Sequence, residues 1–278
     1  MDKKDLRIVY MGTPDFAVES LKRLVENGYH VVGVITMPDK PAGRGHKIQF
    51  SPVKQYALSQ GLPLLQPEKL KDENFLTALR AWNADLQIVV AFRMLPEVVW
   101  DMPRLGTFNL HASLLPQYRG AAPINWAIIN GDTETGATTF FLSHEIDTGR
   151  IIMQRSLPIA PNDNAGTIHD KLMTMGAEMV TDTVDTILDG NISCIEQESL
   201  MTEIPLRPAP KIFKEDCRID WSRSAREIHN FVRGLSPYPA AWCEWKEGAN
   251  TYSPIKIFET EIKAVSYTHL RAHETCAD

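Results

Sequence analysis

The sequence predicts an α/β protein: a doubly wound, Rossmann-like and mostly parallel sheet, followed by a small β-rich domain. Short continuous apolar runs occupy 6–11, 31–36 and 86–92, as expected for parallel strands buried on both faces. Between the first two runs, 15–28 has apolar residues at helical spacing and ends in a glycine. A strand, a helix and a strand within about 30 residues form a βαβ unit, which favours a parallel sheet.

The following elements extend this main domain to residue 190. Their order along the chain is a helix over 51–60, a helix over 73–82, short strands over 108–111 and 138–143, and a long helix over 164–188. The long helix contains no proline and is closed by Asp189 and Gly190. We therefore predict a main domain over 1–190.

The chain changes character after the long helix. Three prolines within 203–210 are typical of a connection, and we predict a linker over 191–208. At the other end, the polar stretch 265–278 matches the pattern of neither domain. A disordered tail, a truncation scar and foreign sequence are all open for it, and it takes no part in the fold prediction.

A small β-rich domain is predicted over 209–264. It begins with a helix over 222–234 that starts at a capping serine. Short strand-like pieces follow at 241–246 and 255–258, separated by glycine, asparagine and proline.

Composition narrows the class of protein. The 278 residues are 44% hydrophobic and 23% charged, as in ordinary globular domains. The four cysteines form no CxxC pair, so no zinc-ribbon or other metal site is predicted.

No signal peptide or membrane-spanning run is seen, and we expect a soluble cytoplasmic protein without a membrane role. A formal net charge of −6 argues against nucleic-acid binding over the whole surface, but it leaves room for a local basic face.

Polar residues that suit catalysis concentrate in 108–149. Alternation along a strand puts Asn109 and His111 on one face, with Leu110 opposite. Asp147 lies in an Asp-Thr-Gly turn after another strand. Open α/β sheets bind ligands at the carboxyl ends of their strands, so we expect all three side chains to reach one crevice.

This trio suits acyl transfer to an amine. The side-chain amide of Asn109 and a protonated His111 can hold the developing oxyanion, and Asp147 can accept or relay the proton of the amine. Each residue taken alone also has a structural interpretation, because buried imidazoles often satisfy neighbouring groups and Asn and Asp fix turns.

Three motifs carry a family resemblance. The runs Asn109-Leu-His111-Ala-Ser-Leu-Leu-Pro116, Tyr118-Arg-Gly-Ala-Ala-Pro123 and Asp147-Thr-Gly149 resemble the signature of the 10-formyltetrahydrofolate-dependent formyltransferases. The resemblance implies that 10-formyltetrahydrofolate is the co-substrate and that Asn109, His111 and Asp147 are the catalytic trio. It also implies that Ser113, Leu114, Leu115 and Pro116 shape the folate site, with Arg119 nearby. The family usually has glycine where this chain has Ala112.

The pterin pocket of this family lies near the end of the third strand. The matching residues here are Phe92 and Arg93, where related sequences often read Tyr-Gly. Taken by itself, Phe92 is equally well explained as core packing after a buried strand.

A basic loop at 37–47 bears on the formyl acceptor. Its prolines and glycines exclude a helix, and Lys40, Arg44 and Lys47 make it cationic. Such loops are often simply solvated connections. This one resembles the loop with which methionyl-tRNA formyltransferases grip the acceptor stem, which implies initiator methionyl-tRNA as partner and Arg44 as the main contact.

The second domain supplies a weaker signal for RNA. Over 205–235 there are four acidic residues against seven basic ones: Arg207, Lys211, Lys214, Arg218, Arg223, Arg226 and Arg233. A mixed-charge surface explains this almost as well as an RNA-binding face. The runs 218–222 and 237–242 resemble the C-terminal domain of the same family, a small OB-like β-barrel. That domain normally continues well beyond residue 263, so we expect an incomplete barrel.

Two other functions are compatible with the same fold. An amino-sugar nucleotide formyltransferase would use the same co-substrate and trio, and a non-catalytic folate or RNA binder would keep only the fold. Gly12-Thr-Pro-Asp after the first strand is not a GxGxxG motif, which argues against a dinucleotide site. We expect the enzyme to be a monomer.

Overall fold

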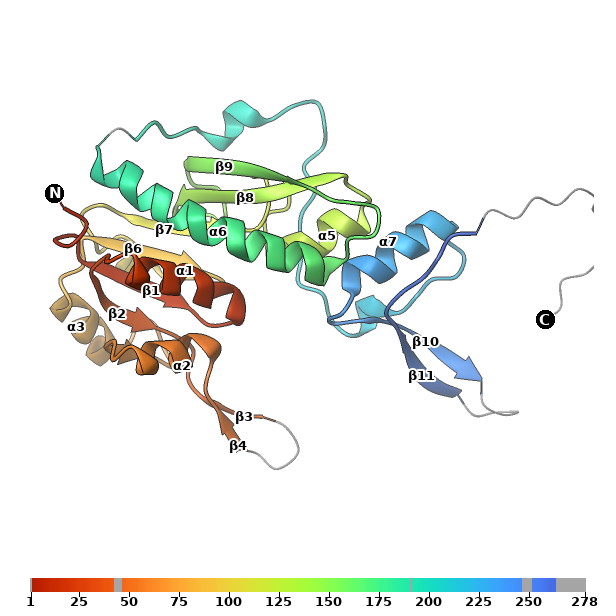
Figure 1. The fold of residues 1–278 in the computed structure, drawn as a ribbon, viewed down its shortest axis with the longest axis horizontal. Helices are drawn as coiled ribbons and strands as arrows, with labels where there is room; N and C mark the ends of the chain where they lie inside the picture. The colour runs from red at the N-terminus through yellow and green to blue at the C-terminus, as the bar shows by residue number, and fades with distance from the viewer. Residues whose placement is uncertain (1, 43–46, 191, 247–251, 264–278) are drawn as a thin grey trace, which may run out of the picture.

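The computed structural model describes residues 2–42, 47–190, 192–246 and 252–263. Figure 1 shows an α/β sheet domain formed by the first two thirds of the chain and a smaller C-terminal domain beside it along the long axis. The predicted tail at 265–278 lies outside the described residues. Among the described residues, no helix combines the length and apolarity needed to cross a membrane.

The sheet domain is built on a seven-stranded mixed sheet. Its spatial order is β5 (Leu64–Leu65), β2 (Val31–Ile35), β1 (Ile8–Gly12), β6 (Leu86–Val90), β7 (Thr107–His111), β8 (Glu134–Phe141) and β9 (Ile151–Pro158). The first five strands are parallel, while β8 runs antiparallel to β7 and β9 antiparallel to β8. Every residue of β1, β2 and β6 is buried, in agreement with the continuous apolar runs.

Helices cover both faces of this sheet, which confirms the doubly wound prediction. One core cluster joins the sheet to α1 (Asp15–Glu26), α2 (Pro52–Ser59) and α6 (Ala165–Leu188). A second cluster on the other face joins it to α3 (Glu73–Ala81) and α4 (Glu97–Trp100). Alternation along the strands divides the two clusters: in β1, Tyr10 belongs to the first and Met11 to the second.

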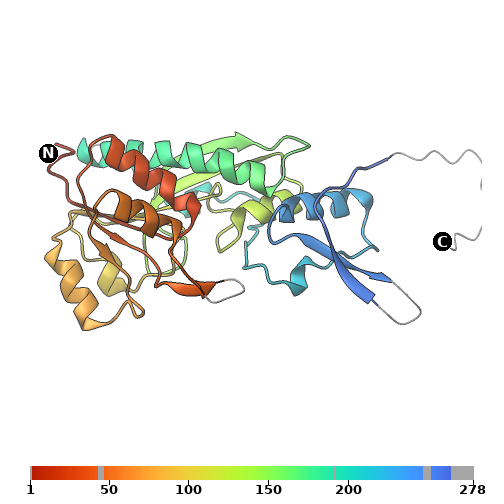
Figure 2. The ribbon, with the colours of Figure 1, turned by 60° about the horizontal axis from the view of Figure 1, so that its bottom comes forward.

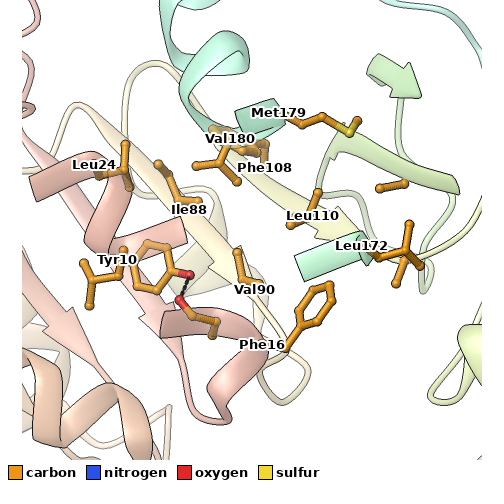
Figure 3. Close-up of a cluster of buried hydrophobic side chains, with 14 of the residues drawn as sticks. Tyr10, Phe16, Leu24, Ile88, Val90, Phe108, Leu110, Leu172, Met179 and Val180 are labelled. Atoms are coloured by element: carbon orange, nitrogen blue, oxygen red, sulfur yellow. Dashed lines mark hydrogen bonds between the residues drawn. The ribbon is translucent and has the colours of Figure 1, made fainter. Parts of the chain in front are cut away.

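Figure 3 shows the core between β1, β6, β7 and the helices α1 and α6. The largest buried side chain there is Tyr10, whose hydroxyl donates to the carbonyl of Ala17 at 2.5 Å. Burial raises the pKa of Tyr10 far above its usual value. The phenol therefore stays neutral, and its one polar atom is satisfied inside an otherwise apolar layer.

Capping residues fix the helix ends where the sequence predicted them. Ser51 accepts from the backbone N–H of Lys54, and Asn164 forms a capping box with Thr167. The helix predicted over 222–234 begins later, as α7 (Ala225–Leu235). Ser224 and Glu227 form the capping box there, whereas Ser222 instead donates to the Asp220 carboxylate.

The strand predicted over 138–143 differs in its bounds. β8 begins at Glu134 instead of 138, because it pairs along its whole length with β9. The strand β9 and the short helix α5 (Pro123–Ile129) were not predicted from the sequence. Both depend on long-range pairing and packing, for which the local pattern carries little signal.

The C-terminal domain holds α7 and an antiparallel pair, β10 (Ala241–Lys246) and β11 (Tyr252–Ile257). The two predicted strands are therefore confirmed, the second beginning at Tyr252 instead of 255, and within the described residues their sheet does not close into a barrel. α7 packs on α5 of the sheet domain, where the Asn125 side-chain amide donates to the Gly234 carbonyl at 2.8 Å. The Arg233 guanidinium also donates to the Asp163 carbonyl at 2.9 Å.

The connection between the domains follows the surface of the sheet domain (Figure 1). Ile195 exchanges backbone hydrogen bonds with Ile151 of β9. Further on, in the loop that follows β7, the Tyr118 N–H donates to the Arg207 carbonyl, and Ala209 donates to Arg119 and accepts from Ala122. Residues 195–209 therefore belong physically to the sheet domain.

Candidate active site

The carboxyl ends of β1, β6 and β7 meet at one edge of the sheet. The parallel register places Gly12 beside Val90, and Val90 beside Leu110. From β1 the chain first builds β2 and β5 on one side and then crosses to β6 on the other. This reversal between β1 and β6 is the topological switch point at which open α/β sheets form ligand crevices.

The alternation of β7 separates the candidate site residues from the side chains of the core. Leu110 is buried in the core and lies against Gly176 of α6. Asn109, on the opposite face, is half-buried, and His111 is 7% exposed. An amide and an imidazole therefore lie two residues apart on the face away from α6.

The contacts of His111 show which of its ring nitrogens is free to interact with a substrate. Nε2 lies 2.8 Å from the carbonyl oxygen of Tyr118, and because a carbonyl can only accept, Nε2 carries a hydrogen. Nδ1 lies 3.9 Å from Oδ2 of Asp147, beyond the range of a direct hydrogen bond. Nδ1 is therefore the ring nitrogen left to interact with a substrate atom or with Asp147.

Asp147 occupies a turn with unusual backbone geometry. Its φ is +56°, a left-handed conformation that Asp tolerates better than most residues. Oδ2 accepts from the backbone N–H of Gly120 at 3.0 Å. A β-carbon on Gly149, two residues later, would overlap the Phe141 carbonyl oxygen. The Asp-Thr-Gly sequence thus meets the steric needs of a turn that aims one carboxylate at His111.

The loop 117–122 supplies both the acceptor for His111 and the donor for Asp147. Tyr118, at φ +61°, donates its hydroxyl to Asp132 at 2.5 Å, and Arg207 donates to the same carboxylate at 2.8 Å. Burial raises the pKa of Tyr118. Gly120 has φ +124°, and a β-carbon there would lie 2.5 Å from the Ala209 carbonyl oxygen. The loop is therefore held against 207–209.

The run 113–116 forms the turn that follows His111. Ser113 and Leu115 are 0% and 2% exposed, Pro116 is buried and Leu114 half-buried. The Ser113 hydroxyl donates to the Gln117 carbonyl at 2.7 Å. Thr138, which the sequence analysis did not single out, donates to the Ser113 carbonyl at 2.7 Å and accepts from the Leu115 N–H. These contacts fix the backbone of the turn next to the trio.

Phe92 and Arg93 follow β6 at the same sheet edge. Phe92 is half-buried and packs against the core cluster on the α3 face. The Arg93 guanidinium donates to the carbonyls of Pro67 and Glu68, and burial lowers its pKa. Its Nε is buried without a hydrogen-bond partner among the described residues. Both side chains therefore lie at the carboxyl end of β6, next to the strand that carries Asn109 and His111.

The predicted basic loop contains a short antiparallel hairpin, β3 (Lys40–Ala42) and β4 (Lys47–Gln49). It projects from the β2 side of the sheet domain (Figure 2). Arg44 lies outside the described residues, as do the side chains of Lys40 and Lys47. At the hairpin base, hydrogen bonds from Lys54 and then from Gln66 hold the pKa of the Asp39 carboxyl below its usual range.

Most arginines of the second basic region have acidic or carbonyl partners. Arg207 pairs with Asp132, Arg218 with Glu244, and Arg223 with Asp220 and Glu227. Among the described residues, no ion pair involves Lys211, Lys214 or Arg226. The local excess of positive charge thus resides in these three exposed side chains.

Known proteins resemble this chain along most of its length. The family model described as Formyl transferase matches residues 6–184, and Formyl transferase, C-terminal domain matches residues 211–270. A methionyl-tRNA formyltransferase from Bacteroides fragilis is 70% identical over 261 residues, 94% of this chain and 81% of that protein. Another, from Parabacteroides distasonis, is 70% identical over 269 residues, 96% of this chain and 83% of that protein. The chain belongs to the methionyl-tRNA formyltransferase family.

Membership in the methionyl-tRNA formyltransferase family confirms the resemblance carried by the motifs at 109–116, 118–123 and 147–149. Solved structures agree on the fold. The 4-N formyltransferase from Francisella tularensis superposes with a TM-score of 0.69 at 18% identity, over 93% of this chain and 100% of that one. Within the described residues, no group of three or more His, Cys, Asp and Glu side chains suits a metal ion.

Three groups that shape this site carry no signal in the sequence. They are the Tyr118 carbonyl, the Gly120 N–H and the side chain of Gln197, which lies in the segment between the domains. The first two are backbone atoms, whose direction no residue type reveals. Gln197 stands in a stretch without periodicity or motif, so only the folded chain brings it to the site.

Proposed function

We propose that this enzyme transfers the formyl group of 10-formyltetrahydrofolate to the α-amino group of methionine on initiator methionyl-tRNA. The observation that carries the proposal is the placement of Asn109, His111 and Asp147 around one sheet edge in a chain of this family. The transfer joins the methionyl nitrogen to the formyl carbon, breaks the bond from that carbon to the folate nitrogen, and moves one proton from amine to folate.

The side chains at the crevice suit a folate. When bound, 10-formyltetrahydrofolate supplies the formyl group. The half-buried Phe92 ring, the Asn109 amide and Arg93, whose Nε has no hydrogen-bond partner among the described residues, suit a flat ring system with polar edges and a formyl oxygen. We propose that the turn of Ser113, Leu114, Leu115 and Pro116 forms the neighbouring wall, mainly through its fixed backbone.

The proposed roles of the trio follow from the atoms that remain available. The Asn109 side-chain N–H groups hold the formyl oxygen as it gains negative charge. His111 acts through Nδ1, because Nε2 is bound to Tyr118. Asp147 keeps the imidazole oriented near the amine whose proton must leave. No residue in this scheme forms a covalent intermediate.

Parallel acceptor assays test the proposal. The purified enzyme is given 10-formyltetrahydrofolate with methionyl-initiator tRNA in one reaction and with an amino-sugar nucleotide in another. Formylmethionyl-tRNA as the only product is expected. Formylation of the sugar alone would keep the trio and refute the tRNA acceptor.

We further propose that the hairpin of β3 and β4 contributes to tRNA binding through Lys40, Arg44 and Lys47. Replacing Arg44 by alanine is expected to raise KM for tRNA about tenfold, because a guanidinium that meets phosphate or an unpaired end is lost. KM for 10-formyltetrahydrofolate should stay unchanged. Arg80→Ala on the exposed face of α3 is the matched control, and equal tRNA kinetics in both variants would remove Arg44 from this role.

We also propose that the enzyme works as a monomer and in the cytoplasm, where aminoacylated tRNA and reduced folates are found. Light scattering coupled to size-exclusion chromatography tests the first point. A mass near 31.3 kDa is expected over the concentration range of the activity assay, and a mass of twice that value would contradict it.

A further inference from the structure

Gln197 is buried within a segment that is otherwise exposed. It opens the short 3₁₀ helix η1 (Gln197–Leu200) between the two domains. Glu196, Glu198 and Ser199 beside it are exposed, whereas Gln197 is 0% exposed. A glutamine is rarely buried so completely unless its amide is fully hydrogen-bonded.

The Gln197 amide uses all of its hydrogen-bonding capacity at the active site. Nε2 donates to the carbonyl oxygens of Asp147 and Gly149, each at 2.8 Å. Oε1 accepts from Nε and Nη2 of Arg119 at 3.1 and 2.7 Å. Carbonyls only accept and guanidinium groups only donate, so the orientation of this amide is fixed.

These bonds join two separate parts of the catalytic machinery. Asp147 and Gly149 belong to the turn after β8, while Arg119 lies in the loop that holds His111 and Gly120. The Asp147 carboxylate is already tied to that loop through the Gly120 N–H. Gln197 adds a second hydrogen bond, to the backbone carbonyl of Asp147. The left-handed φ of Asp147 is sparsely populated, so this backbone needs such support.

We propose that Gln197 is a positioning residue that sets the distance and direction of the Asp147 carboxylate relative to His111. The segment between the domains therefore contributes to formyl transfer itself, besides connecting the domains. This inference rests on the proposed catalytic role of Asp147. Its physical basis is that a displacement of about 1 Å in a reacting group can cost about 10²-fold in rate.

The test compares Gln197→Leu with Gln87→Leu. Gln87 is also 0% exposed, and it accepts from Thr107 at the far end of the same sheet. We expect Gln197→Leu to lower kcat about 10- to 100-fold, with KM for both substrates within about twofold. Gln87→Leu should keep kcat. Equal kcat in the two variants, both folded by circular dichroism, would overturn the proposal.

Gln197→Glu separates the hydrogen bonds to Arg119 from those to the Asp147 turn. The isosteric carboxylate keeps an acceptor for Arg119 but places an oxygen against the carbonyls of Asp147 and Gly149. If the Asp147 turn is what Gln197 controls, this variant loses at least as much kcat as Gln197→Leu. Near-normal kcat would show that only Arg119 matters and would overturn the proposal. Because it preserves shape, this variant also carries the test if Gln197→Leu fails to fold.

Asp147→Asn in the same assay distinguishes this inference from the proposed function. Asparagine also tolerates the left-handed backbone, so the turn is kept while the charge is lost. A large loss of kcat in Asp147→Asn with full activity in Gln197→Leu refutes the role of Gln197 alone. Full activity in Asp147→Asn refutes the catalytic role of Asp147 on which both depend.

Discussion

Replacement of His111 by alanine is expected to lower kcat by about 10²- to 10⁴-fold, the usual range for loss of a group that moves or holds a proton in the transition state. The imidazole is held at Nε2 by the Tyr118 carbonyl, and its Nδ1 faces Asp147. Alanine removes both functions and leaves Asp147 without its partner. Single-turnover formylation of methionyl-tRNA at saturating folate measures the chemical step directly.

A histidine control and a double variant make this result interpretable. His30→Ala changes an exposed histidine before β2 and should leave kcat unchanged. If His111 and Asp147 act as one unit, His111→Ala combined with Asp147→Asn should cost little more than the worse single variant. Additive losses would mean that the two side chains act independently, against the orienting role given to Asp147.

Replacement of Asn109 by alanine is expected to lower kcat about 10²- to 10³-fold, as for other removals of a single oxyanion donor. Asn109 is half-buried and points away from the core that β7 shares with α6. The free energy of unfolding should therefore change little. Steady-state kinetics and urea unfolding on the same preparation give both quantities.

Leu110→Ala is the natural counterpart, because it changes the next residue on the other face of the same strand. Leu110 is 3% exposed and packs in the main core cluster, so its truncation should cost about 2–5 kcal/mol of stability. The kcat of the folded fraction should survive. If both variants instead lose kcat and stability together, the alternation of β7 does not separate chemistry from packing as inferred.

Local sequence patterns predicted the parts of the fold whose causes are local. Buried apolar runs predicted β1, β2 and β6, and the helices predicted from residues 51 and 164 begin there because Ser51 and Asn164 cap α2 and α6. β9 was missed because its partly exposed residues show no clear alternation, and its pairing with β8 decides its structure. The helix predicted from a capping serine at residue 222 is instead capped by Ser224, because the Glu227 carboxylate completes a capping box there.

The same division applies to the active site. The motifs contain Asn109, His111 and Asp147 together, and the β7 register explains why the first two share a face. The motifs do not reveal the hydrogen bonds that hold these side chains in place. They come from the Tyr118 carbonyl, the Gly120 N–H and the distant Gln197. Backbone direction and contacts across 50 residues of chain are set by the whole fold and leave no local pattern.

The path of the segment 195–209 has a consequence for anyone who would re-engineer the enzyme. Grafting a new acceptor-recognition module after α6, at the apparent end of the sheet domain, would remove Gln197, Arg207 and Ala209 along with the old module. A chimera cut at residue 190 would keep every motif residue and still lack the contacts that hold their loops. A junction placed after residue 209 would carry the complete catalytic unit to its new partner.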